Sequence, residues 1–275
     1  MTIGRMMLLE LRRMAVSPRW GIVGAVCLIA AWLAESSVRV AAINSHVPAG
    51  AEDVYLATAN NLMLVGCLAL PAFALVATGS LAADRSSGFV TLTLCRVGRR
   101  SCVWIAKVVA LIGGAFITQL VLAATSYMVA IYAGYTPSYS PSALALVPIS
   151  ETSMSLFAPA LPGDDQTLRV LAAMGFLTLA FSAVGTLALA VSVRWPNEFL
   201  PPALLLGVVV FDWLIVRFSH LGVFDRISLS AHLLESTHIS TLPDSMSWAS
   251  SVAYFAVVMI LGAVGGWWLL ERYDV

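Results

Sequence analysis

The densest cluster of basic side chains in this sequence lies between two long apolar segments, at residues 84–107. Five of the fifteen lysines and arginines are found there, namely Arg85, Arg96, Arg99, Arg100 and Lys107. Such a cluster favours contact with an acidic surface, because complementary charge steers and orients the encounter of two proteins. We therefore predict a contact surface here, on the cytoplasmic side of a membrane.

Asp212 is the second candidate, because it lies within an apolar segment and a carboxylate inside a membrane is costly unless it has a partner. Candidate partners for an ion pair are Arg217, Arg39 and Arg169. A role in a substrate pathway or a proton relay is the alternative to a buried ion pair. Glu35 stands four residues before Arg39, and this spacing predicts a local ion pair on one helix.

Other patterns for catalysis or metal binding are weak or absent. Imidazole is a ligand for copper and zinc, but the histidines all fall in polar loops, where such residues collect anyway, so no metal site is predicted. They are His46, His220, His232 and His238. There is no CxxC pair, P-loop, HExxH helix or Gly-x-Ser-x-Gly elbow. The chain is therefore not expected to be an enzyme, and any ATP-driven work requires a partner.

The composition is that of an integral membrane protein. Hydrophobic residues make up 60% of the chain, charged residues only 11%, and the mean hydropathy is +0.89, whereas soluble domains have about 25% charged residues. The apolar segments are continuous and reach the ~20 residues that a spanning helix needs, which favours α-helices over a β-barrel. A net charge of zero argues against a nucleic-acid partner.

We predict an all-α protein with six transmembrane helices in a single transmembrane domain, residues 1–275. Pro71 is expected to kink the second span. The third span is long enough to include a tilt or a cytoplasmic turn. The spans are expected at residues 20–41, 57–81, 103–133, 170–193, 199–216 and 249–270.

Before the first span, residues 1–19 are predicted to form an amphipathic helix in the membrane interface. Its apolar side chains share one broad face at helical spacing, whereas Arg12 and Arg13 fall mostly elsewhere. Pro18 ends this helix, and Trp20 is expected at the level of the lipid headgroups.

Basic residues also set the orientation, since they are more frequent in cytoplasmic segments. Most of them lie inside if the N-terminus is cytoplasmic, and an even number of spans then places the C-terminus on the same side. A cytoplasmic helix is expected in residues 82–107, whereas residues 134–168 and 217–248 are expected to be extracytoplasmic.

Gly262 and Gly266 form a GxxxG motif in the last span, which permits close approach of two helices. The motif is as compatible with a contact within the chain as with the interface of a dimer.

The order of these parts resembles that of the ABC-2-type transporter permeases, the six-helix membrane subunits of ATP-binding-cassette transporters. In that family a coupling segment after the second span has an acidic residue four before a glycine, then an apolar run, an arginine, and a lysine seven residues later. The matching positions are Asp84, Gly88, Leu92, Leu94, Arg100 and Lys107, whereas Phe89, Val97 and Ala106 replace the common threonine, proline and glycine.

Shorter matches flank this segment. Glu10-Leu11-Arg12 and the run 17–20 are similar to the family's interfacial helix and its entry into the first span, and the run 272–275 is similar to its cytoplasmic ending. Asn197-Glu198 and the run 210–212 are similar to the permease of the transporter that matures nitrous-oxide reductase.

The resemblance implies the membrane subunit of a transporter in a bacterial plasma (inner) membrane, working by alternating access. ATP and Mg²⁺ would bind to separate cytoplasmic ABC ATPase subunits, and this chain would bind no cofactor. Coupling to the ATPase would fall to Asp84, Gly88, Arg96, Arg99, Arg100 and Lys107, beside an interfacial helix with Glu10, Arg12 and Arg13. A second permease copy or homologue and an extracytoplasmic accessory protein are further expected partners. The alternative is a membrane-embedded assembly or anchoring protein without a transport cycle.

Overall fold

The structure is a computed structural model that describes residues 3–46, 48–86, 100–136, 166–195, 197–219, 228–233 and 248–272. These residues form helices and no β-strand, so the prediction of an all-α protein is confirmed. The elements are α1 (Ile3–Ala15), α2 (Trp20–Ser45), α3 (Ala51–Ala59), the π-helix η1 (Met63–Ala69), α4 (Leu70–Ser86), α6 (Arg100–Tyr132), α7 (Gln166–Arg194), α8 (Leu200–Ser219), α10 (Leu229–Leu233) and α11 (Trp248–Arg272).

Four of the described helices, α2, α6, α7 and α11, are long and apolar enough to cross a membrane. A fifth span results if α3 and the helical segment Met63–Gly79 are counted together. The apolar part of α8, Leu200–Ile215, is shorter. The chain thus has the helices of a multi-pass membrane protein, whereas a count of six spans remains a prediction.

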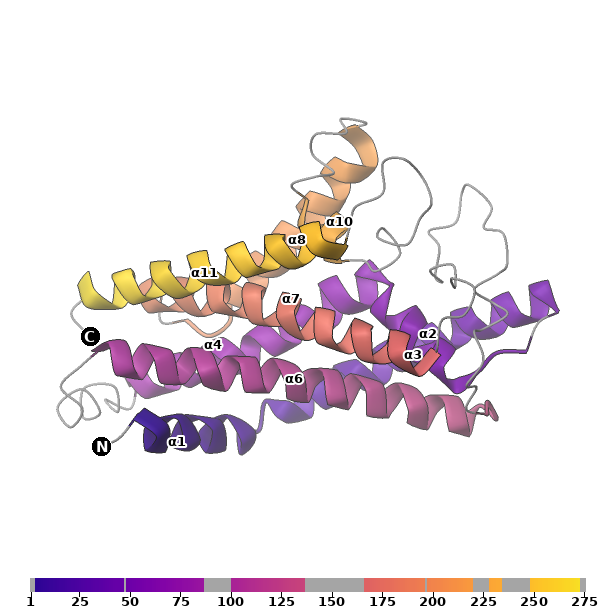
Figure 1. Cartoon of the computed structure of the whole chain (residues 1–275), viewed down its shortest axis with the longest axis horizontal. Coiled ribbons are helices and arrows are strands. Elements are labelled where there is room, and N and C mark those ends of the chain that lie inside the picture. Colours follow the sequence, from indigo (N-terminus) through magenta and orange to yellow (C-terminus); the bar gives the residue numbers. More distant parts are fainter. Residues whose placement is uncertain are drawn as a thin grey trace.

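Helix α7 lies at the centre of the bundle (Figure 1), where it packs against α11, α6, α4, α3 and α8. Phe181 of α7 meets Phe73 of α4 with ring centroids 5.6 Å apart. Phe176 of α7 meets Phe255 of α11 in an edge-to-face contact at 5.6 Å. All four rings are buried, so these aromatic pairs anchor the helices around α7.

The second predicted span, residues 57–81, is not one straight helix. Helix α3 and the following helical segment meet at an angle of 66°. The bend falls at two adjacent asparagines, and the side-chain Oδ1 of Asn61 accepts hydrogen bonds from the backbone N–H groups of Met63 (3.0 Å) and Leu64 (3.3 Å). An asparagine in this position caps a new helix, which explains why the chain stops and restarts here.

Pro71 is therefore not the site of this bend. It is the second residue of α4, and only Leu70 separates it from the π-helix η1. Proline has no backbone N–H and cannot complete a normal α-helical turn, so the adjoining turn widens to the rarer π form instead of breaking.

Pro18 lies between α1 and α2, as predicted, and the first spanning helix begins two residues later at Trp20. The indole Nε1 of Trp20 donates a hydrogen bond to the carbonyl of Met14, 2.7 Å away. This carbonyl lies at the end of α1, where it has no partner within the helix, and it also accepts a hydrogen bond from the backbone N–H of Ser17 at 3.0 Å. Trp20 thereby fixes the direction in which α2 leaves α1.

The GxxxG motif of α11 makes its contacts within the chain. A Cβ atom at Gly262 would lie 2.6 Å from Oγ1 of Thr186 and 2.9 Å from the backbone nitrogen of Leu187, so α11 approaches the backbone of α7 here. A Cβ atom at Gly266 would collide with the ring of Trp104 on α6. The two glycines therefore form a seam between α11 and its neighbours α7 and α6.

We expect Gly262→Ala to lower the free energy of unfolding by about 1–3 kcal/mol, because the added methyl group forces the two helix backbones apart. Gly265→Ala is the matched control, since no atom lies within 4 Å of a Cβ atom at that position. Thermal unfolding of the purified chain in detergent measures the difference. Equal melting temperatures for the two variants would contradict the close approach of α11 to α7.

Candidate functional site

Helix α6 is longer than a membrane crossing requires. Its 33 residues span ~50 Å at 1.5 Å per residue, compared with a hydrocarbon core of about 30 Å. Both of its charged residues, Arg100 and Lys107, lie in its first turns. The extra length is therefore at the N-terminal end of α6, where it forms a straight extension of the spanning helix.

Helix α1 packs along this extension, and the two helices run in the same direction (Figure 1). Met6 of α1 is buried against Val103 and Ala106 of α6. Further along α1, Met14 lies against Gly114 of α6. A Cβ atom at Gly114 would lie only 2.6 Å from the sulfur of Met14. The small residues of α6 thus accept the large apolar side chains of α1.

Between these apolar contacts lies a buried ion pair. The Nζ of Lys107 is 3.2 Å from Oε2 of Glu10, and the two side chains are only 2% and 4% exposed. Lys107 is the only lysine in the chain. Removing one partner of such a pair leaves a buried charge without compensation, which costs about 3–5 kcal/mol. The pair therefore fixes how α1 is aligned along α6, since any other alignment would separate the two buried charges.

Arg100 connects the same extension to the end of α11. Its Nη1 donates hydrogen bonds to the carbonyls of Leu270 (3.0 Å) and Glu271 (3.2 Å). The last carbonyls of a helix lack partners within it and carry partial negative charge, so a guanidinium group suits this position. Trp104, one turn further along α6, donates from Nε1 to the carbonyl of Ala263 at 2.7 Å. The extension of α6 thus contacts α1 and also holds α11.

A third contact joins the start of α2 to the segment between α7 and α8. Arg19 forms an ion pair with Glu198. Its guanidinium group passes over α4 at Gly79, where a Cβ atom would collide with it. Thr78 of α4 also donates a hydrogen bond to the carbonyl of Glu198, at 3.3 Å. A glycine at residue 79 is therefore what allows Arg19 to reach Glu198.

We refer to this set of contacts as the basal end. It comprises α1, the start of α2, the first turns of α6, the segment between α7 and α8, and the end of α11. The start of α1 and the end of α11 lie on the same side of the molecule (Figure 1).

The structure describes only part of the predicted coupling set. Lys107 of this set contacts Glu10 of the predicted interfacial helix, and Arg100 lies beside α11. Asp84 is in the last turn of α4. Gly88, Arg96 and Arg99 lie outside the described residues. The pair of Arg19 and Glu198 was not predicted as a contact, although a lone glutamate in the short loop between two apolar segments was a signal that could have drawn attention to it.

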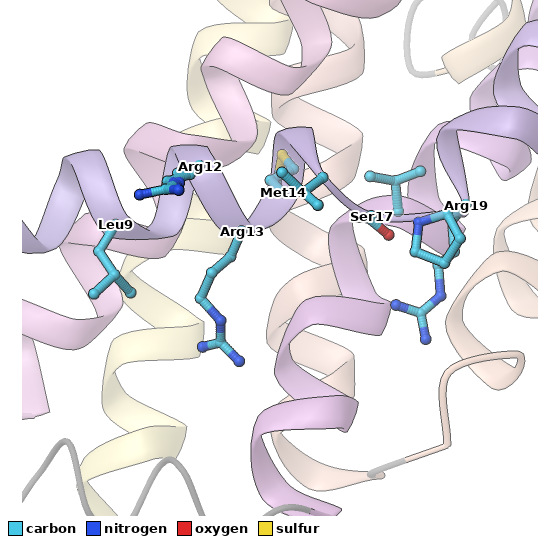
Figure 2. A pocket seen from close by; sticks show the side chains of 9 residues that line it. Leu9, Arg12, Arg13, Met14, Ser17 and Arg19 are labelled. Carbon is cyan, nitrogen blue, oxygen red and sulfur yellow. The ribbon is translucent and has the colours of Figure 1, made fainter.

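A groove of about 480 Å³ opens at the basal end, between α1, the turn into α2 and one face of α4 (Figure 2). Arg12, Arg13 and Arg19 contribute its charged lining. Figure 2 shows the side chains of Arg13 and Arg19 extending to the same side of the chain, from α1 and from the turn into α2 respectively. Of the predicted interfacial residues, Arg12 and Arg13 therefore line an open groove and Glu10 lies in the buried contact with α6.

The carboxylate of Asp212 has hydrogen-bond donors close by. Its Oδ2 accepts a hydrogen bond from Oγ of Ser228 at 2.8 Å and from the backbone N–H of Ser230 at 2.7 Å. Ser230 is in the first turn of α10, so Asp212 caps this short helix from α8. The side chain of Arg217, one of the candidate partners, lies outside the described part of the chain.

Arg39, another candidate partner of Asp212, is engaged on its own helix. Its Nη2 lies 2.6 Å from Oε1 of Glu35, which confirms the predicted local ion pair. The hydroxyl of Tyr135 also contacts Oε1 of Glu35, at 3.3 Å. Burial and the neighbouring carboxylate of Glu35 raise the pKa of Tyr135, which follows the end of α6.

His232 is the histidine with the most extensive described contacts. Its Nδ1 lies 2.7 Å from Oγ of Ser251, and its ring stacks on Tyr254 with centroids 4.1 Å apart. Over the part of the chain that the structure describes, no three histidine, cysteine or acidic side chains converge to hold a metal ion. His232 thus serves to pack α10 against α11.

Comparison with protein-family models finds no match to this sequence, and comparison with curated proteins finds none either. The functional argument therefore depends on the geometry of the basal end.

Proposed function

We propose that this chain is the permease subunit of an ABC transporter, and that its basal end receives work from cytoplasmic ATPase subunits. The buried pair of Glu10 and Lys107 is the observation that supports this most directly. It fastens α1, whose opposite face is exposed, to a helix long enough to cross the membrane. A displacement of α1 by a bound partner would therefore move α6 as well.

The contacts of the basal end extend this connection. Arg100 ties the start of α6 to the end of α11, and Arg19 ties the start of α2 to the segment before α8. Rigid helices with specific contacts at one end transmit small shifts to their other ends. A push on α1 would in this way reach helices throughout the bundle.

In the proposed cycle, ATP and Mg²⁺ bind between two ATPase subunits, which close and move the coupling segments of two permease chains. This movement shifts the population of the permease between inward-facing and outward-facing states. The predicted contact residue Arg99, which lies outside the described residues, would meet acidic residues on the ATPase. Both termini would be cytoplasmic, in a bacterial inner membrane.

The test is copurification with the ATPase encoded by the neighbouring gene, using Arg99→Glu. Reversing one charge at the contact is expected to weaken ATPase binding by about tenfold or more. Arg272→Glu is the matched control, because Arg272 is exposed at the end of α11 and undergoes the same change of charge. Arg100 is not used, since its replacement would also disturb α11.

If the ATPase stays bound to the Arg99→Glu chain and ATP turnover in the complex is unchanged, the assigned contact is wrong. If no ATPase copurifies even with the unmodified chain, the alternative of a membrane-embedded assembly or anchoring protein is favoured.

A further inference from the structure

The groove at the basal end combines positive charge with apolar walls. Arg12, Arg13 and Arg19 line it together with Leu9 and Val16. Arg19 uses its Nη2 for Glu198, but a guanidinium group carries five N–H donors and one carboxylate does not exhaust them. Glu10, the acidic residue of α1, is shared by two basic side chains, since it lies 3.2 Å from Lys107 and 3.9 Å from Nη1 of Arg13. The two carboxylates, Glu10 and Glu198, thus stand against four basic groups, Arg12, Arg13, Arg19 and Lys107. The groove therefore has an excess of positive charge and suits a phosphate, which guanidinium groups bind well.

The apolar residues beside the arginines narrow the choice of anion. Val16 is 76% exposed and Leu9 is 37% exposed, and both line the groove next to charged side chains. Val76 of α4 also lines the groove but is already buried. A free phosphate ion or an acidic protein loop would leave Leu9 and Val16 in water, whereas an amphipathic helix at a bilayer surface buries such residues among acyl chains.

We propose that this groove binds one anionic phospholipid. The phosphate group lies among Arg12, Arg13 and Arg19, and an acyl chain covers Leu9 and Val16. The lipid would hold α1 at the bilayer surface from one side, while the pair of Glu10 and Lys107 holds it to α6 from the other. This site does not depend on the proposed transport function, because it needs only the chain and a membrane.

The experiment titrates the purified full-length chain in detergent with phosphatidylglycerol and counts bound lipids by native mass spectrometry. Phosphatidylcholine with the same acyl chains is the uncharged comparison. We expect one phosphatidylglycerol to bind preferentially, and Arg12→Gln or Arg13→Gln to weaken its binding about fivefold, the effect of one basic residue near an anionic lipid. Arg5→Gln is the matched control, because Arg5 is exposed on the same helix but does not line the groove.

A second pair of variants tests the apolar half of the site. Leu9→Ser is expected to weaken phosphatidylglycerol binding, whereas Leu8→Ser is not, since Leu8 is exposed on α1 outside the groove. Gel filtration of each variant checks that the protein compared is folded, and Arg13→Lys, which keeps the charge, is expected to retain most of the binding.

Three results would overturn the proposal. Equal losses with Arg5→Gln and Arg12→Gln would mean that the lipid responds only to the overall charge of α1. Displacement of the lipid by an equal concentration of glycerol phosphate would mean that the groove binds a free anion. Equal binding of phosphatidylcholine would mean that the arginines do not select the headgroup.

Discussion

Replacing Lys107 by methionine is expected to lower the free energy of unfolding by about 3–5 kcal/mol, the largest stability loss that a single substitution at the basal end should cause. The reason is electrostatic, since the buried carboxylate of Glu10 would lose its closest and only buried counter-charge among the described contacts. The exposed Arg13, whose Nη1 lies 3.9 Å from Oε1 of Glu10, compensates only in part. Glu10→Leu is expected to have a similar effect, because the buried ammonium group of Lys107 would lose this carboxylate. The double variant, with two apolar side chains in contact, is expected to recover most of the lost stability, because no charge is then removed from water.

Denaturant unfolding of the detergent-solubilised chain gives the four free energies of this double-mutant cycle. Arg5→Met serves as the control, because Arg5 is exposed on α1 and such surface substitutions usually change stability by less than about 0.5 kcal/mol. If the losses of the two single variants simply add in the double variant, Glu10 and Lys107 do not interact. The connection of α1 to α6 would then have to depend on the packing of Met6 and Met14 alone.

The spanning helices were the part of the fold that the sequence predicted well. The expected spans at 103–133 and 249–270 correspond to α6, Arg100–Tyr132, and α11, Trp248–Arg272. Agreement within a few residues has a simple cause. A backbone in hydrocarbon must satisfy its own hydrogen bonds, so a long apolar run has few options other than a helix.

The break in the second span does not lie at the residue that the sequence analysis predicted. Pro71 was expected to bend the helix, but a widened turn accommodates it. The actual break is at Asn60 and Asn61, whose short polar side chains hydrogen-bond to the backbone. In an otherwise apolar segment, two adjacent asparagines are the stronger sign of a helix end.

The contacts of the candidate site were beyond what the sequence alone can predict. Glu10 and Lys107 were each selected, from segments almost a hundred residues apart, but their pairing depends on how α1 is aligned along α6. The clue to that alignment is Gly113-Gly114, where α6 accepts Leu11 and Met14. The ion pair of Arg19 and Glu198 likewise requires α4 to present Gly79 between them.

Asp212→Ala is expected to cost about 3 kcal/mol, because it removes the acceptor of two hydrogen bonds and a bond to a charged group contributes about 1.5 kcal/mol or more. The bonds come from Ser228 and from the backbone of Ser230. Ser228→Ala removes one of these two bonds and is expected to cost about half as much. Thermal unfolding in detergent measures both losses, and an unchanged melting temperature in Asp212→Ala would exclude a capping role.

Asp212→Asn separates the two roles that a carboxylate within α8 allows. Both described bonds are accepted by a single oxygen, Oδ2, and the carbonyl oxygen of asparagine can take its place, so stability should fall by less than about 1 kcal/mol if Asp212 serves only to cap α10. An amide does not titrate, however, so the same substitution would abolish a proton relay while leaving the fold intact. A folded Asp212→Asn chain that still stimulates ATP turnover in the complex would therefore assign the carboxylate to structure. A folded chain that had lost this stimulation would place Asp212 in the transport pathway, with Ser228 as its nearest partner.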